Sequence, residues 1–160
     1  MNNIEYDVVG ITDDLDDESR AREDAHYVEF QMDKAAAPVE QLTEYDGELP
    51  LIVSNRPEWA GGDASESTRL EELLAAASAD AVDIVEIDLK TIRNEEWLID
   101  EVRENEVDVI VAYYDFEQTP EKSELQELIM ECDEYGDISK VSVFAEERED
   151  ALLLLDCLNE

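Results

Sequence analysis

Short apolar runs alternate with longer amphipathic segments along this sequence, and that alternation restricts the possible folds more than any other feature. The clearest case is the stretch Val107–Phe144. Its apolar runs Val107–Ala112 and Val141–Phe144 are short enough to be strands buried on both faces, and they flank a charged helical segment. Thr119 and Pro120 are expected to begin that helix, as its N-cap and its first helical residue. A strand, a helix and a second strand in this order predict a parallel pair with a right-handed crossover.

The same alternation occurs six times. The expected strands are Asp7–Ile11, Tyr27–Met32, Leu49–Ser54, Val82–Leu89, Val107–Ala112 and Val141–Phe144. The expected helices cover about 14–24, Pro38–Glu44, a segment capped by Ser67 or Thr68, a segment containing Ile92, Trp97, Ile99 and Val102, about 120–135, and Glu146–Leu158. These patterns predict one α/β domain over residues 1–160, with about six parallel βα units. A complete (β/α)₈ barrel takes about 250 residues, so the chain is expected to form an incomplete TIM-barrel-like sheet. A doubly wound sheet is the alternative, although no GxGxxG follows the first strand, which disfavours dinucleotide binding.

The charge of the chain limits its environment and its partners. Forty-six acidic residues and eleven basic ones give a formal net charge of −35, spread over every predicted helix. Self-repulsion of this size is screened when the Debye length falls to about 3 Å near 1 M salt, so we expect a cytoplasmic protein of a salt-loving organism. Nucleic acid is excluded as a partner because phosphate binding needs clustered Lys and Arg.

No apolar run approaches the roughly 18 residues of a membrane span, and the amino terminus does not resemble a signal peptide. Cys132, Cys157 and His26 lack metal-ligand spacing, so no metal site is expected.

Polar side chains are concentrated near the carboxyl ends of the predicted strands, where parallel α/β folds place their chemistry. They are Glu29, Gln31, Asp33, Arg56, Glu86, Asp88, Tyr113, Tyr114, Asp115 and Lys140. Such residues are costly to bury unless they are paired, so their presence on several strands indicates a functional cavity. Lys140 precedes a buried run, and a desolvated lysine is the usual nucleophile of Schiff-base chemistry. The alternative is that Lys140 is only a lysine at a strand edge.

The stretches AREDAHYVEFQMD, YDGELPLIVSNRPEWAGGDA, DIVEIDL, DFEQTP and GDISKVSVFAEEREDALLLL resemble type I 3-dehydroquinate dehydratase, especially its haloarchaeal versions. The resemblance extends from about Val8 to Leu155 and implies a (β/α)₈ barrel without metal or cofactor. It implies elimination of water from 3-dehydroquinate, a small carboxylate, in the pathway to aromatic amino acids. By this resemblance Lys140 forms the imine and Asp88 orients the catalytic histidine. Glu29 and Arg56 contact the substrate.

The sequence departs from the family pattern at four points. Tyr114 stands where the family has its proton-carrying histidine, and Gln31 replaces an arginine of the substrate site. A serine that ends the first strand of the family has no clear counterpart here. The resemblance also stops two βα units before the end of the barrel. We therefore expect a family member with impaired activity whose site consists of Lys140, Tyr114, Asp88, Glu29, Gln31 and Arg56.

Two other functions are compatible with the residues. One is a noncatalytic paralogue or fragment that binds a small carboxylate or a protein partner, and the other is an unrelated lyase or aldolase that uses Lys140. An open sheet edge could also support a homo-oligomer.

Overall fold

One six-stranded parallel sheet forms the centre of the molecule. The computed structural model describes residues 6–157. The strands follow each other in chain order across the sheet, each hydrogen-bonded to the next. They are β1 (Val9–Thr12), β2 (Tyr27–Gln31), β3 (Leu51–Ser54), β4 (Val82–Asp88), β5 (Asp108–Asp115) and β6 (Ile138–Val143). This confirms the predicted parallel and sequential order.

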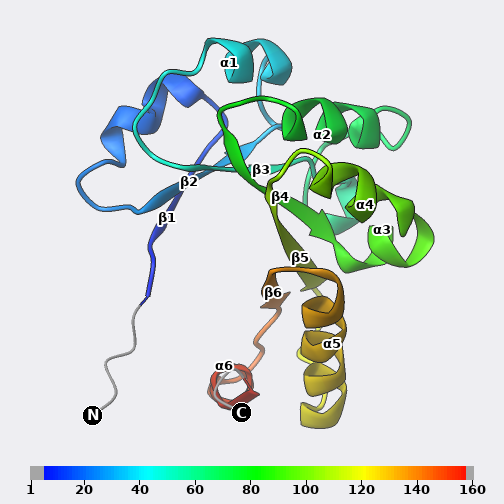
Figure 1. Cartoon of the computed structure of the whole chain (residues 1–160). Coiled ribbons are helices and arrows are strands. Elements are labelled where there is room, and N and C mark those ends of the chain that lie inside the picture. Colours follow the sequence, from blue (N-terminus) through cyan, green and yellow to red (C-terminus); the bar gives the residue numbers. More distant parts are fainter. Residues whose placement is uncertain (1–5, 158–160) are drawn as a thin grey trace.

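Helices connect the strands. They are η1 (Leu15–Arg20), α1 (Pro38–Glu44), η2 (Glu58–Ala60), α2 (Arg69–Ala77), α3 (Leu89–Asn94), α4 (Trp97–Arg103), α5 (Lys122–Tyr135) and α6 (Arg148–Cys157). Figure 1 shows helices α1 to α5 along the outer side of a curved sheet, with α6 near the last strand. This arrangement follows from the sequential order of the parallel strands, because right-handed crossovers that all run in one direction along the sheet lie on the same face.

The sheet separates two apolar regions of different size. The larger region lies between the strands and the helices and includes Phe30, Val53, Val85 and Val111, all buried. The smaller one, on the opposite face, consists of Ile52, Ile84 and Ile110 packed with Tyr27. Alternate residues of each strand point to opposite faces, so each of the central strands contributes to both regions. The small cluster therefore marks the concave, inner face of the sheet.

A contact between distant strands measures the curvature. Lys140 on β6 and Glu29 on β2 are separated by four strand-to-strand steps, which amount to about 19 Å in a flat sheet. Their side chains nevertheless meet, with Lys140 Nζ 3.0 Å from Glu29 Oε2. Only a strongly curled sheet allows this, so the six strands form the wall of an open barrel.

Several predicted elements need correction. The helix expected over 14–24 is a 3₁₀ helix, in which Leu15 and Glu18 are buried on one side three residues apart, as the 3₁₀ period requires. The single helix expected after β4 is two helices, α3 and α4, because the backbone of Glu95 is not helical. Helix α5 begins at Lys122, after Glu121 at its N-cap position. Thr119 does not cap it, because its hydroxyl donates to the carbonyl of Phe144 at 2.9 Å.

The expectation that the last strand is buried on both faces is also wrong. Most of β6 is half-buried, and Ile138 is 44% exposed. On the opposite edge, Ile11 of β1 is 64% exposed. Both strands have a neighbour on one side only within the described sheet, which leaves their inward side chains partly uncovered. Pairing of these edges in a homo-oligomer stays a prediction.

Candidate functional site

Five polar side chains from five consecutive parts of the chain meet on the concave face. Glu29 comes from β2, Arg56 follows β3, Glu86 lies on β4, Tyr114 on β5 and Lys140 on β6. Apart from Arg56, each belongs to a strand and points inward by the alternation that also points the isoleucines of the small cluster inward. The structure thus brings together four of the six residues predicted for the site, and adds Glu86.

Lys140 is held between two carboxylates. Its Nζ lies 2.6 Å from Glu86 Oε2 and 3.0 Å from Glu29 Oε2. Burial by itself would lower the pKa of Lys140, but the negative charges of Glu86 and then Glu29 outweigh it and raise the pKa. The side chain is 33% exposed on the concave face. Lys140 therefore rests as an ammonium ion that a small molecule can still reach.

Glu29 has further polar partners. Its Oε1 accepts a hydrogen bond from Ser54 Oγ at 3.1 Å and lies 3.8 Å from Arg56 Nη2. Ser54 ends β3 beside β2, so the strand register fixes this contact. Arg56 also carries a buried Nε donor with no acceptor among the described residues. A guanidinium with a spare donor is suited to bind an anionic group of a ligand.

The loop after β3 holds Arg56 in place. The Arg56 amide donates to Asp33 Oδ1 at 3.2 Å, and the amide of Asp63 donates to the other oxygen of Asp33 at 3.3 Å. A Cβ on Gly62 would lie 2.0 Å from the Arg56 carbonyl oxygen, so the loop can close this tightly only with glycine there.

Tyr114 connects this group to a neighbouring cavity. Its hydroxyl donates to Glu86 Oε1, and its ring stacks on Phe116 with 5.8 Å between centroids. Burial and then the charge of Glu86 raise the pKa of Tyr114 well above the ordinary value of 10.0. Tyr114 also lines a cavity of about 480 Å³, together with residues that include Trp59, Lys90 and Phe116. Tyr114 is therefore a neutral hydrogen-bond donor in this site.

Glu86 is among the polar residues predicted at the strand ends, but it is not one of the six residues predicted for the site. It is 4% exposed and contacts both Lys140 and Tyr114. Burial and then the nearby charge of Glu29 raise its pKa, although Lys140 opposes this. Alternation along β4 places Glu86 and Asp88 on one face and cannot choose between them. The position of each residue along the strand determines which one reaches the site. Glu86 pairs with Ser54 in the register of β3 and β4, and the sequence alone does not give this register.

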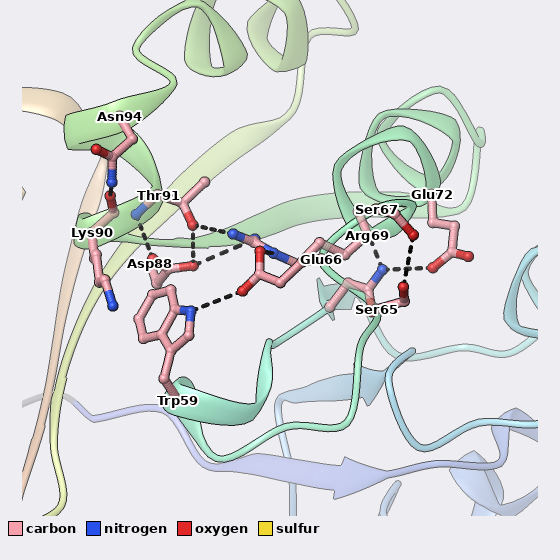
Figure 2. A network of polar contacts seen from close by, with 11 residues as sticks. Trp59, Ser65, Glu66, Ser67, Arg69, Glu72, Asp88, Lys90, Thr91 and Asn94 are labelled. Atoms are coloured by element: carbon pink, nitrogen blue, oxygen red, sulfur yellow. Dashed lines mark hydrogen bonds and ion pairs between the residues drawn. The ribbon is translucent and has the colours of Figure 1, made fainter.

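Asp88 and Tyr114 line the same cavity, but no hydrogen bond or ion pair joins them among the described residues. Asp88 ends β4 and caps helix α3, with Oδ1 accepting from the Thr91 amide at 2.6 Å and Oδ2 from the Thr91 hydroxyl at 2.7 Å. Arg69 lies 3.7 Å from the same carboxylate and donates to the Thr91 hydroxyl at 2.7 Å. Figure 2 shows this network, in which Arg69 also reaches Glu66 and Glu66 accepts from the indole of Trp59. A catalytic role for Asp88 stays a prediction, and its observed contacts hold helix α3 and the β3–α2 connection on β4.

Gln31 lies at the end of β2, two residues beyond Glu29, and is half-buried.

Within residues 6–157, no three His, Cys, Asp or Glu side chains are grouped as a metal site would require. None of the described helices is long and apolar enough to cross a bilayer.

Comparisons with known proteins point to one family. The family model described as Type I 3-dehydroquinase matches residues 11–160. The 3-dehydroquinate dehydratase of Haloquadratum walsbyi is 38% identical over 94% of this chain and 66% of its own length. The corresponding protein of Haloarcula marismortui is 34% identical over 97% of this chain and 70% of its own length. The chain thus spans about two thirds of the length of these relatives.

Solved structures agree on the fold. The structure of 3-dehydroquinate dehydratase from Enterococcus faecalis superposes with a TM-score of 0.84 at 22% identity, over 96% of this chain and 72% of that one. The structure from Geobacillus kaustophilus gives 0.82 at 23% identity, over 96% and 68%. At such identities the likeness concerns the fold alone. It confirms the TIM-barrel-like class predicted from the alternating units.

Proposed function

Because the chain belongs to the type I 3-dehydroquinase family, we propose that Lys140 forms an imine with the ketone of 3-dehydroquinate, and that this chain dehydrates the bound substrate slowly. The observation that carries the proposal is the position of Lys140 Nζ, within 3.0 Å of two buried carboxylates and open to the concave face. An amine in such a place can react with a carbonyl compound once it loses its proton.

The imine would act as an electron sink. It withdraws electrons from the carbon next to the former ketone, which eases removal of a proton there, and the neighbouring hydroxyl then leaves as water. Arg56 supports binding of the substrate carboxylate, because its guanidinium is permanently charged and its Nε has no acceptor among the described residues. Glu29 forms an ion pair with this guanidinium at 3.8 Å.

Slow turnover follows from Tyr114. General acid–base catalysis is worth roughly 10²–10⁴ in rate when the pKa of the group lies near the working pH. The pKa of Tyr114 is raised far above neutrality by burial and by Glu86, so its phenol keeps its proton and cannot serve as an efficient base. Gln31 adds no positive charge for the substrate carboxylate.

The direct test is formation of the conjugated enone from 3-dehydroquinate in about 1 M KCl, followed by ultraviolet absorbance. We expect weak but measurable activity that disappears in Lys140→Ala. Turnover at the rates usual for enzymes, about 1–10³ per second, would contradict slow dehydration. Equal activity in the native chain and in Lys140→Ala would contradict the role of Lys140.

A second function is supported by one observation. The two ion pairs that raise the pKa of Lys140 keep it charged at neutral pH, as in a noncatalytic site that binds a small carboxylate. In that case the native chain would bind 3-dehydroquinate in titration calorimetry, whereas borohydride would trap no adduct at any pH.

A further inference from the structure

The two carboxylates that flank Lys140 have different surroundings. Glu29 accepts from Ser54 and lies beside Arg56, so a permanent positive charge balances it. Glu86 has no such cation besides Lys140 among its contacts in the described structure, and its other oxygen accepts from the neutral hydroxyl of Tyr114. Both side chains are almost fully buried. Of the two, Glu86 is therefore the one placed to exchange a proton with Lys140.

We propose that Glu86 is a catalytic residue that takes the proton of the Lys140 ammonium and returns it to the departing oxygen during imine formation. This inference rests on the proposed function and adds to it the proton carrier that Tyr114 cannot be. Glu86 Oε2 is 2.6 Å from Lys140 Nζ, a hydrogen-bond distance that needs no bridging water.

The steps balance without another reactant. Glu86 first takes one proton from the ammonium, leaving a neutral amine. The amine nitrogen attacks the carbonyl carbon, the carbon–oxygen double bond becomes a single bond, and a nitrogen proton moves to the oxygen. Glu86 then gives its proton to the resulting hydroxyl, which leaves as water while the nitrogen lone pair forms the iminium double bond. The carboxylate of Glu86 is restored at the end.

Tyr114 has a positioning role in this scheme. Its hydroxyl donates to Glu86 Oε1, so the opposite oxygen, Oε2, is directed at Lys140. Burial and the charge of Glu29 raise the pKa of Glu86, which favours a carboxyl group able to hold a proton for part of the cycle. Tyr114 keeps its own proton because its pKa is raised still further from neutrality.

Two matched variants separate a proton carrier from a simple ion-pair partner. Glu86→Gln and Glu29→Gln each remove one negative charge beside Lys140, so electrostatics alone predicts a lower Lys140 pKa and faster reaction of its amine in both. The gain is about tenfold for each unit by which the pKa falls. If Glu86 carries the proton, Glu86→Gln instead slows imine formation, by about 10²-fold at the lower end of acid–base effects.

The probe is formaldehyde with cyanoborohydride, which methylates lysines through an imine and needs no substrate recognition. The full chain is treated in about 1 M KCl over a pH series, and methylation of Lys140 is measured by peptide mass spectrometry relative to the exposed Lys34. We expect slower Lys140 methylation in Glu86→Gln, faster methylation in Glu29→Gln, and partial recovery in Glu86→Asp. Circular dichroism of each variant confirms that it is folded.

Methylation in Glu86→Gln that equals or exceeds that of the native chain would overturn the role of Glu86. If Glu86→Gln does not fold, Tyr114→Phe is tested in its place. This change removes the donor to Glu86 and is expected to slow Lys140 methylation, whereas an unchanged rate overturns the proposal. A native chain that forms no adduct with 3-dehydroquinate, yet shows the opposite effects of the two glutamine variants with formaldehyde, would refute the proposed substrate and leave the proton role intact.

Discussion

Strand β4 takes part in two buried cation–carboxylate groups that differ in what they can do. Asp88 belongs to the first group, with Arg69, Thr91 and Glu66. Glu86, two residues earlier, belongs to the second, with Lys140, Tyr114 and Glu29. In the first group the cation is an arginine, which stays protonated, and a backbone amide holds the carboxylate. In the second group the cation is a lysine that can lose its proton.

The two groups are therefore expected to have different roles, the Arg69 group in stability and the Lys140 group in chemistry. The Arg69 group connects helices α2 and α3 and the loop at Trp59, so every member has a partner within the protein. The Lys140 group faces the concave side, and the neighbouring Arg56 has an Nε donor without an acceptor among the described residues. We therefore expect changes in the first group to affect unfolding, and changes in the second to affect imine formation.

Arg69→Met should have the largest effect on stability. It leaves Asp88 buried without its ion pair, which costs about 3–5 kcal/mol in other proteins. Urea unfolding in 2 M KCl measures the change in the free energy of unfolding, and imine formation at Lys140 should be unaffected. The control is Arg20→Met at an exposed pair with Asp17, where about 0–1 kcal/mol is expected. If Arg69→Met has native stability but no longer forms the imine, the assignment of the Arg69 group to stability and not to chemistry is wrong.

Tyr114→His should raise enone formation by about 10²-fold, because an imidazole titrates near about pH 6.5 and can carry a proton at neutral pH. The rate of enone formation is the measurement. Tyr113→His is the matched control, since Tyr113 packs against the outer apolar region and points away from Lys140. If Tyr114→His has no effect while Lys140 still forms an adduct, weak substrate binding and not proton transfer limits the native chain.

Asp88→Asn should have a smaller effect, on stability alone. Asparagine is as good an N-cap as aspartate, so the bond from the Thr91 amide is kept, while Arg69 loses one of its two carboxylate partners and keeps Glu66. We expect a loss of about 1.5 kcal/mol in the free energy of unfolding. The rate of adduct formation at Lys140, measured in the same samples, should match that of the native chain. A clear fall in that rate would support the catalytic role that the family resemblance assigns to Asp88.

The sequence allowed most of the fold and part of the site to be predicted. The apolar runs placed all six strands, because parallel strands covered by helices need continuous apolar segments, and Pro38–Glu44 was predicted to the residue. Thr119 misled the prediction of the α5 start, since its hydroxyl has a distant partner, Phe144, that local sequence does not reveal. The choice between Glu86 and Asp88 depends on how far each lies along β4, which the alternation of side chains does not specify.

Salt bridges between distant strands were beyond sequence reasoning for a similar reason. The meeting of Lys140 and Glu29 depends on the curl of the whole sheet, and no local pattern encodes that curl. The residue types were nevertheless informative, because a lysine and a glutamate inside apolar strands already indicated paired burial.

The pH dependence of adduct formation at Lys140 tests the central difference between the two groups most directly. The native chain is incubated with 3-dehydroquinate and borohydride in about 1 M KCl, and the modified peptide is identified by mass spectrometry. Because the surrounding carboxylates raise the pKa of Lys140 above the ordinary 10.5, the amount of adduct should increase with pH through the alkaline range and be confined to Lys140. Absence of any adduct on Lys140 up to the pH at which the chain unfolds would contradict the account.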